Sequence, residues 1–330
     1  MNPRWQQTLA SRGATLDEAG LAVFPPAPPG AKVLLADLGH LVLIGIEGRD
    51  AADFLQNQLT SDVAGLADGQ WQWSGYCNPK GRLLATLRLM RLGDRFLAEL
   101  PRTLAGDLVA RLSRYVLRSQ VKIAVLEDEA IGIGLAGLEP AVELGTVSPG
   151  DHGVAAVDGG FVVRAGQDRW HCYLTVDAAI AAWDRFASRA APATTGDWMR
   201  FDVADGIPWI LPATRELFVP QMVDLERIGG VSFSKGCYPG QEIVARSQYL
   251  GEVKRRLHVA QAAAALDPGA PVGSAGQTAG NVVASAPAGD GGFRVLAVID
   301  AETASQGNVS ATTSGTRLEA LRRVHAPAAR

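Results

Sequence analysis

Residues 70–91 read QWQWSGYCNPKGRLLATLRLMR, and this stretch predicts a β-hairpin. Its first half alternates from Trp71 to Cys77 with the period of a strand that buries one face. The run NPKG at 78–81 is typical of a turn, because proline presets one backbone dihedral and glycine tolerates positive φ. A leucine-rich run follows the turn and can return beside the first strand. We therefore expect two paired antiparallel strands here.

Helices and strands flank this hairpin in an order typical of α+β proteins. On its N-terminal side, 41–46 is a continuous apolar run that predicts a buried strand. The segment 48–59 has helical spacing and is expected to end at the polar cluster 60–62. Its expected apolar face comprises Phe54, Leu55 and Leu59.

On the C-terminal side of the hairpin, a turn at Gly93-Asp94 precedes a strand expected at 95–100. A helix with Leu104, Leu108 and Leu112 on one face and a strand at 121–127 come next. The resulting order, β-α-β-β-β-α-β, predicts a sheet with helices on one face.

A second, fainter version of this pattern follows. Strands are expected at 131–135, 160–165 and 169–176, with a helix at 178–188 whose apolar side holds Ile180, Trp183 and Ala187.

From residue 253 on, short β-like runs separated by glycine-rich turns predict a small all-β barrel or sandwich. The helix before it is expected to stop at Gly251, where we place the boundary, and the tail 324–330 is expected to fray. We predict three domains: 1–40 together with 128–250, then 41–127, then 251–330.

Composition narrows the possible functions. The formal net charge is −3 over 330 residues, so no overall field favours binding to nucleic acid phosphates. The three cysteines lie far apart and none forms a metal-ligand spacing, so we expect neither a disulfide framework nor a metal site. No apolar segment is long enough to cross a membrane. We expect a soluble, cytoplasmic protein, monomeric, without direct nucleic acid or membrane binding.

Residues 234–242, SKGCYPGQE, place Cys237 beside Lys235 and just before an expected helix. Pro239 suits the first turn of that helix, and Glu242 favours its positive end. Helix-end dipoles and a nearby ammonium stabilise a thiolate, which is how reactive cysteines are prepared. The alternative interpretation is a plain turn in which Cys237 is a small buried hydrophobe. Spacing alone slightly favours this alternative.

Four stretches of the chain read as recognisable motifs. They are KGCYPGQEIVAR (235–246), FLQNQLTSDV (54–63), CNPKGRLLATLR (77–88) and the region from ADGIPWI to GGVSFSKGC. Together these motifs resemble the YgfZ family of folate-binding proteins, relatives of the T-protein of the glycine cleavage system. The resemblance spans residues 37–257. It implies a three-domain, cloverleaf-like ring of two α+β sheet domains and a C-terminal β-barrel, with tetrahydrofolate bound without a covalent bond in the central hole.

The resemblance also implies a role in assembling or repairing the iron–sulfur clusters of particular enzymes, including those that thiolate transfer RNA. Its partners would be iron–sulfur enzymes or cluster-assembly proteins. Cys237 would be the functional thiol and Lys235 its electrostatic neighbour, with Gly236 and Gly240 shaping the loop. The residues expected to contact folate are Asp202, Asp205, Tyr238, Gln241, Glu242 and Arg246.

Two departures from the relatives bear on the reaction. The T-protein has an aspartate beside the reacting folate nitrogen, whereas Ala85 and Thr86 occupy that neighbourhood here. A lost acid/base helper commonly costs about 10²–10⁴ in rate, so we do not expect a classical aminomethyltransferase. Relatives also often have a pterin-binding glutamate where this chain has Ala204, and Asp202 or Asp205 are the possible substitutes.

Three hypotheses follow. The first is a folate-dependent accessory protein for iron–sulfur enzymes, with Cys237 acting by transient chemistry. The second is a folate-dependent aminomethyl or other one-carbon transferase. The third is a binding module that acts through protein contacts alone.

Overall fold

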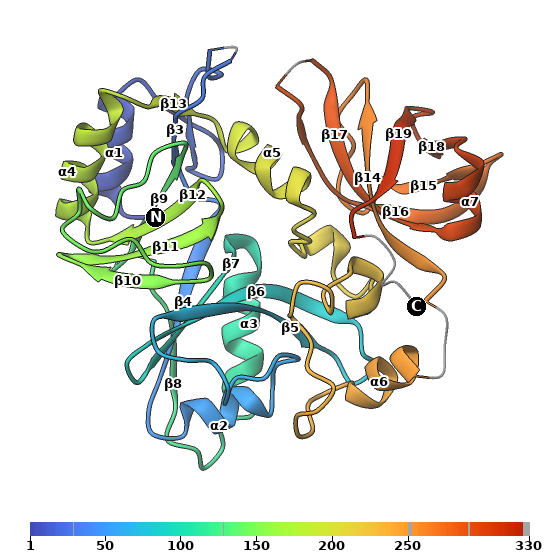
Figure 1. Ribbon diagram of the computed structural model, residues 1–330, viewed down its shortest axis with the longest axis horizontal. Coiled ribbons are helices and arrows are strands. Elements are labelled where there is room, and N and C mark those ends of the chain that lie inside the picture. Colours follow the sequence, from blue (N-terminus) through green and yellow to red (C-terminus); the bar gives the residue numbers. More distant parts are fainter. Residues whose placement is uncertain (29, 128, 250–252, 290, 326–330) are drawn as a thin grey trace. The chain divides into compact units, whose positions relative to one another are not determined.

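The computed structural model describes residues 1–28, 30–127, 129–249, 253–289 and 291–325 (Figure 1). The helices are α1 Pro3–Ser11, α2 Ala51–Gln56, α3 Arg102–Ser113, α4 Val176–Ala187, α5 Thr195–Asp205, α6 Gln241–Tyr249 and α7 Ala301–Gln306, with short 3₁₀ turns at Pro212–Thr214 and Pro220–Val223. The strands before α4 are β1 Thr15–Leu16, β2 Ala22–Val23, β3 Leu34–Asp37, β4 Leu41–Glu47, β5 Gln70–Cys77, β6 Leu83–Leu92, β7 Arg95–Pro101, β8 Lys122–Val125, β9 Ile131–Ala136, β10 Val154–Val157, β11 Gly160–Gly166 and β12 Arg169–Leu174. The strands after α4 are β13 Ala191–Ala193, β14 Arg255–Ala262, β15 Pro271–Ser274, β16 Gln277–Pro287, β17 Phe293–Asp300, β18 Val309–Ala311 and β19 Arg317–Arg323.

The predicted hairpin is confirmed as β5 and β6, which are neighbours in a five-stranded sheet of order β5-β6-β7-β4-β8. Asn78 holds the turn between them, because its side chain accepts from the backbone N–H groups of Lys80 and Arg82 at 2.9 and 3.0 Å. The chain order from β4 through β8 is the β-α-β-β-β-α-β order expected from the sequence.

The expected helix over 48–59 is half as long, because α2 ends at Gln56. The Gln56 side-chain oxygen accepts from the N–H groups of Val63 and Ala64, at 2.7 and 3.1 Å, and so turns the chain back. Leu59 lies past the helix and forms an isolated bridge with Tyr76. The expected cap at 60–62 is therefore wrong.

The second half forms a six-stranded sheet of order β10-β11-β12-β9-β3-β13, with α1 and α4 side by side (Figure 1). The two helices meet through Trp5 and Trp183, whose rings are 5.6 Å apart, edge to face. The face expected for α4 is partly wrong, since Ala187 is exposed and Phe186 is buried.

The C-terminal segment closes into a six-stranded barrel of order β14-β17-β16-β15-β18-β19. Its interior is filled by small and branched side chains such as Val272, Val282 and Ile299. Two of its strands were not predicted from the sequence: β15, which is only four residues long, and β19, whose apolar pattern is interrupted by charged residues. The expected fold class, two α+β sheets followed by a small β-barrel, is confirmed. The domain limits stay predictions. Gly251, where a boundary was expected, and residues 326–330 of the tail lie outside the described residues.

By compactness the chain divides into two units. The first comprises Met1–Phe54, Gly65–Gln72 and Arg88–Trp198, and the second comprises Leu55–Ala64, Trp73–Leu87 and the residues from Met199 on. None of the helices in the described part of the chain combines the length and apolar composition that crossing a bilayer requires.

Candidate functional site

The segment around Cys237 is a loop of the second unit that leads into α6, and Lys235 fastens it. The Lys235 Nζ donates to the carbonyl oxygens of Leu59 and Ser61, at 2.8 and 2.7 Å. It also lies 5.5 Å from the centre of the Tyr238 ring, within cation–π range. Burial lowers the pKa of Lys235 to about 8, against the opposing attraction of Asp62. The lysine therefore joins two segments that are far apart in the sequence.

Residues 60–61, expected as a helix cap, form the floor beneath this loop instead. The Thr60 hydroxyl donates to the Gly230 carbonyl at 2.5 Å and accepts from the Gly75 N–H at 2.7 Å. The backbone carbonyl of Thr60 accepts from the Ser232 N–H at 2.8 Å. Because Thr60 is fully buried, these hydrogen bonds are shielded from competing water.

Gly240 fixes the other end of the loop. Its φ is +81°, and an added Cβ would lie 2.5 Å from the Asn78 carbonyl oxygen and 2.6 Å from the Gly81 Cα. The motif loop is thus pressed against the hairpin turn, at a distance that only glycine permits. A residue with this dihedral cannot be helical, so α6 starts at Gln241 and Pro239 lies before the helix rather than in its first turn.

The two motif glycines should respond differently to substitution. We expect Gly240→Ala to destabilise the second unit by at least about 1–2 kcal/mol, from the left-handed dihedral alone, before the clash is counted. Gly236→Ala is the matched control, because nothing lies within 4 Å of an added Cβ and φ is not positive there. Urea unfolding of both variants measures the difference. Equal stability of the two would contradict the packing of the loop on the turn.

Cys237 is exposed, so the interpretation of this residue as a small buried hydrophobe is wrong. The other two cysteines, Cys77 and Cys172, are buried, and burial raises the pKa of each thiol to about 12. Reactivity of a thiol needs both access and a thiolate, so neither of these is suited to chemistry at neutral pH. Among the described residues, no group of three or more His, Cys, Asp or Glu side chains is placed to hold a metal ion.

The structure brings several expected folate-contacting residues to this loop. Tyr238 is 6% exposed, and its hydroxyl has no hydrogen-bond partner among the described residues. Among the described residues, the Gln241 side chain makes a single long contact, a donation to the Lys235 carbonyl at 3.5 Å, so its amide is available. Glu242 and Arg246 are exposed on the first two turns of α6.

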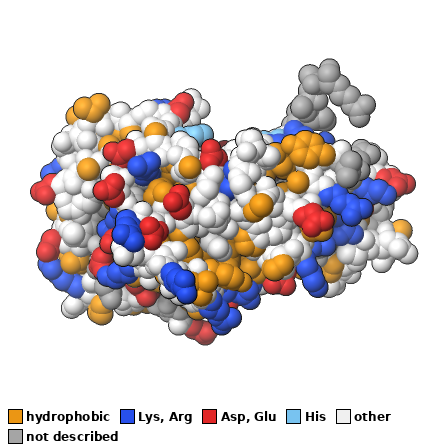
Figure 2. Space-filling model, turned by 90° about the horizontal axis from the view of Figure 1, so that it is seen from below, with side chains coloured by type: hydrophobic (Ala, Val, Ile, Leu, Met, Phe, Trp, Pro, Cys, Tyr) orange, Lys and Arg blue, Asp and Glu red, His pale blue; other side chains and the backbone are white. Residues whose placement is uncertain are grey.

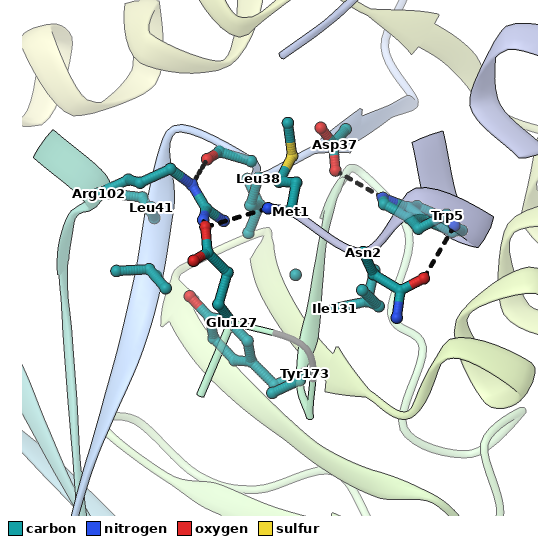
Figure 3. A pocket seen from close by; sticks show the side chains of 14 residues that line it. Met1, Asn2, Trp5, Asp37, Leu38, Leu41, Arg102, Glu127, Ile131 and Tyr173 are labelled. Atoms are coloured by element: carbon teal, nitrogen blue, oxygen red, sulfur yellow. Dashed lines mark hydrogen bonds and ion pairs between the residues drawn. The ribbon is translucent and has the colours of Figure 1, made fainter. Parts of the chain in front are cut away.

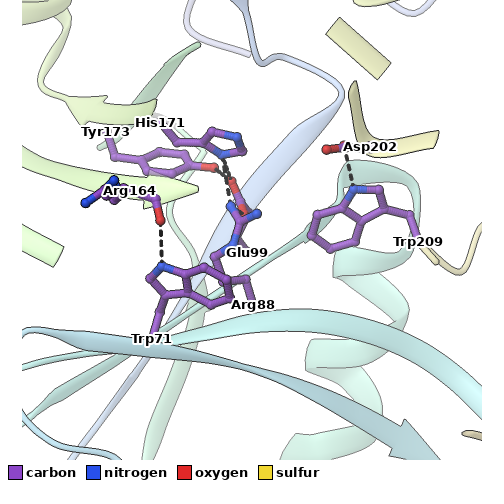
Figure 4. Close-up of polar contacts among 8 residues, drawn as sticks. All are labelled: Trp71, Arg88, Glu99, Arg164, His171, Tyr173, Asp202 and Trp209. Carbon is purple, nitrogen blue, oxygen red and sulfur yellow. Dashed lines mark hydrogen bonds and ion pairs between the residues drawn. The ribbon is translucent and has the colours of Figure 1, made fainter. Parts of the chain in front are cut away.

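The two expected pterin-binding carboxylates belong to another element, α5. Asp202 is buried and accepts from the indole nitrogen of Trp209 at 2.9 Å (Figure 4), whereas Asp205 is exposed at the end of the helix. Asp202 is thus held by a structural hydrogen bond, which reduces its capacity to bind a pterin.

Sequence reasoning missed Gln58, which lies one residue before the Leu59 carbonyl that binds Lys235. It is 9% exposed, and its side-chain oxygen has no partner in the described part of the chain. Unsatisfied buried polar atoms are few in native proteins, and a ligand is one explanation for them. The sequence did contain a signal for Gln58. In the helix expected over 48–59, this polar residue falls on the same face as Phe54 and Leu55, where burial is expected.

The neighbourhood in which the T-protein is expected to have its aspartate holds Ala85 and Thr86. Thr86 is fully buried, and its hydroxyl donates to the Pro208 carbonyl at 2.8 Å and accepts from the Ile210 N–H at 3.0 Å. Ala85 beside it has no polar group. Neither residue can supply the carboxylate that aminomethyl transfer uses.

Two polar clusters in the first unit also escaped the sequence analysis. One is a fully buried group of Arg88, Glu99, His171 and Tyr173 (Figure 4). The other surrounds a cavity of about 20 Å³ beside Asp37 and Trp5 (Figure 3), where burial raises the pKa of Asp37 to about 6 against the opposing hydrogen bond from Trp5. That cavity holds about one water molecule and is far too small for a folate.

Comparison with known proteins supplies the relatives of this chain. Residues 30–158 match the family model described as the GCVT N-terminal domain. The tRNA-modifying protein YgfZ of Edwardsiella ictaluri is 32% identical over 298 residues, covering 85% of this chain and 90% of the relative. The protein of the same name from Escherichia coli O157:H7 is 32% identical over 244 residues, covering 71% and 74%.

Among solved structures, the glycine cleavage system aminomethyltransferase T from Bartonella henselae aligns with a TM-score of 0.74. The alignment covers 99% of this chain and 97% of that one, at 20% sequence identity. At this identity the likeness shows a shared fold.

Proposed function

Because this chain belongs to the YgfZ family of tRNA-modifying proteins, we propose that it is a tetrahydrofolate-binding accessory protein that helps to assemble or repair iron–sulfur clusters. Its clients would be cluster-dependent enzymes that modify transfer RNA in the cytoplasm. The observation that carries the proposal is the exposed thiol of Cys237, presented on a loop that Lys235 fastens at one end and Gly240 at the other.

The arrangement of the loop supports a chemical role for this thiol. A cysteine that only fills space is buried, as Cys77 and Cys172 are. Fastening a loop costs conformational entropy, which the two hydrogen bonds of Lys235 and the contact at Gly240 must offset. Such rigidity is expected where a reactive group must be held in a fixed position.

The side chains around the loop offer the hydrogen-bonding and charged groups that a folate requires. Tyr238 offers a buried hydroxyl and Gln58 a buried carbonyl oxygen, both without partners in the described residues, which suit the amino and ring N–H groups of a pterin. Arg246, exposed on α6, suits a carboxylate of the glutamate tail. When bound, tetrahydrofolate would either report one-carbon status or supply a reactive pterin.

Folate binding is tested by titrating purified protein with tetrahydrofolate. We expect Tyr238→Phe to weaken binding about 5–10-fold, the value of one neutral hydrogen bond. Tyr249→Phe, at the C-terminal end of α6, is the matched control, since Tyr249 is 69% exposed, and should bind as wild type does. Wild-type protein without measurable affinity would contradict the folate site, and, if the cellular role persisted, would favour a binding module that acts through protein contacts alone.

A one-carbon transferase is the alternative function. It requires a carboxylate, and the neighbourhood where the T-protein has its aspartate holds Ala85 and Thr86 here, with the Thr86 hydroxyl already committed to two backbone groups. Formation of methylenetetrahydrofolate from an aminomethyl donor at an ordinary turnover rate would support this alternative. The absence of this product with every donor tested would exclude it.

A further inference from the structure

The near balance of charge over the whole chain conceals one strongly basic segment. Residues 108–126 contain four cations and no aspartate or glutamate. Figure 2 shows basic and acidic side chains interspersed over one face of the molecule. The cations of this segment, which we call the basic turn, are Arg111, Arg114, Arg118 and Lys122.

The basic turn is an ordered structure at the end of α3. Backbone hydrogen bonds join Tyr115 to Leu112 at 2.9 Å, Val116 to Ser113 at 3.3 Å and Ser119 to Val116 at 2.7 Å. Within it, Tyr115 is 52% exposed and Leu117 is 87% exposed. Leu117 also has a φ of +42°, a left-handed conformation that L-residues with side chains avoid. The turn therefore displays an aromatic and an aliphatic side chain to solvent in a defined conformation.

The cations of the basic turn have no ion-pair partner among the described residues. Arg114, Arg118 and Lys122 are exposed, and Arg111 is half-buried. Two carboxylates near the C-terminal end of the basic turn already have arginine partners: Glu47, opposite Lys122 across β4 and β8, pairs with Arg95 at 2.6 Å, and Asp50, bonded to the Gln120 N–H, pairs with Arg49 at 3.5 Å. Neither carboxylate therefore forms an ion pair with a cation of the basic turn.

Local helix electrostatics explain only part of the excess of cations in the basic turn. Arg111 and Arg114 lie at the C-terminal end of α3, where the negative end of the helix dipole favours cations. That effect falls off within the last turn, so it does not reach Arg118 or Lys122. It also gives no reason to expose Tyr115. A partner that carries negative charge and planar rings would account for both the clustered cations and the exposed aromatic side chain.

We propose that the basic turn binds RNA, with its cations on backbone phosphates and Tyr115 stacked on an unpaired base. Phosphate contacts by lysine and arginine, together with base stacking on aromatic side chains, are the usual means of binding RNA without strict sequence choice. Arginine and tyrosine are also common at protein interfaces, but a protein partner would have to supply a matching cluster of carboxylates, whereas RNA carries a phosphate at every nucleotide. The proposal concerns the first unit and does not depend on the chemistry of Cys237.

The test uses the full-length protein and a fluorescein-labelled, unmodified transfer RNA transcript, with binding followed by anisotropy. At about 50 mM salt we expect Arg114→Glu/Arg118→Glu to bind at least about tenfold more weakly than wild type. Loss of two phosphate contacts should also reduce the slope of log affinity against log salt by about 1.4–1.8. Tyr115→Ala should weaken binding with little change in that slope, because stacking releases no counterions.

Lys254→Glu/Arg255→Glu is the matched control. Both residues are exposed, they lie in the second unit, and the pair changes the net charge by the same amount. We expect this variant to bind within about twofold of wild type. Equal weakening by both double variants, equal competition by duplex DNA, or no wild-type binding tighter than about 10⁻⁴ M would overturn the proposal. Unchanged RNA binding with lost cellular activity would assign the basic turn to a protein partner instead.

Discussion

In cells that lack their own copy of this protein, Cys237→Ala is expected to restore at most about a tenth of the cluster-dependent transfer RNA thiolation that wild type restores. A thiolate is the nucleophile and metal ligand that alanine cannot replace. Because Cys237 is exposed, the substitution should leave the melting temperature unchanged. The measurement is the thiolated fraction of the modified nucleoside by mass spectrometry.

Two controls make this result interpretable. Cys237→Ser nearly keeps the size of the side chain but is a far poorer nucleophile, so it should behave as Cys237→Ala does. Alkylation of the folded protein should label Cys237 and spare the buried Cys77 and Cys172. Equal rescue by wild type and Cys237→Ala would make the cysteine a turn residue. If neither wild type nor Cys237→Ala restored thiolation, the proposed accessory function would be contradicted, and the one-carbon transferase would become the leading alternative.

The local parts of the fold were predictable from the sequence. The β5–β6 hairpin and the order of elements through β8 follow from alternation and turn residues, which act over a few positions. The length of α2 did not, because a side-chain hydrogen bond from Gln56 to residues beyond the helix overrides the helical spacing. The resemblance to the YgfZ family, based on a few motifs, is confirmed by relatives that align over most of the chain.

The candidate site was predictable only as a list of motif residues. The string SKGCYPGQE identified Lys235 and Cys237, yet the carbonyl groups that hold Lys235 belong to Leu59 and Ser61, more than 170 positions away. Contacts between segments so far apart leave no periodic pattern. The buried cluster at Glu99 was equally hidden, although charged residues inside the apolar runs of β6 and β7 were a signal that could have been followed.

That buried cluster should dominate the stability of the first unit. Arg88 and Glu99 lie directly opposite each other on β6 and β7, and both are less than 2% exposed. The Glu99 carboxylate pairs with Arg88 and accepts from His171 and Tyr173 (Figure 4). Glu99→Gln would leave the arginine charge buried without compensation. We expect it to lower the free energy of unfolding of this unit by about 3–5 kcal/mol.

The matched control is Glu47→Gln in the same sheet, because Glu47 also pairs with an arginine, Arg95, but both side chains are well exposed. Its effect should stay within about 0.5 kcal/mol, as for most surface ion pairs. Urea unfolding at pH 7, followed by tryptophan fluorescence, measures the difference; one of the seven tryptophans, Trp71, has the guanidinium carbon of Arg88 4.7 Å from its ring centre. Similar midpoints for the two variants would contradict a decisive role for the buried pair.

The pH dependence of the same comparison tests the electrostatic cause. Burial alone would raise the pKa of Glu99, but the charges of Arg88 and His171 and the hydrogen bonds from His171 and Tyr173 lower it to about 2. A carboxyl whose pKa is depressed in the folded state stabilises that state fully above its unfolded pKa, about 4.3, and loses this contribution as the pH falls toward 2. The gap in stability between wild type and Glu99→Gln should therefore be constant from pH 7 to about 5 and narrow below that. A gap that persists unchanged at pH 3 would show that Glu99 stabilises the unit by shape rather than by charge.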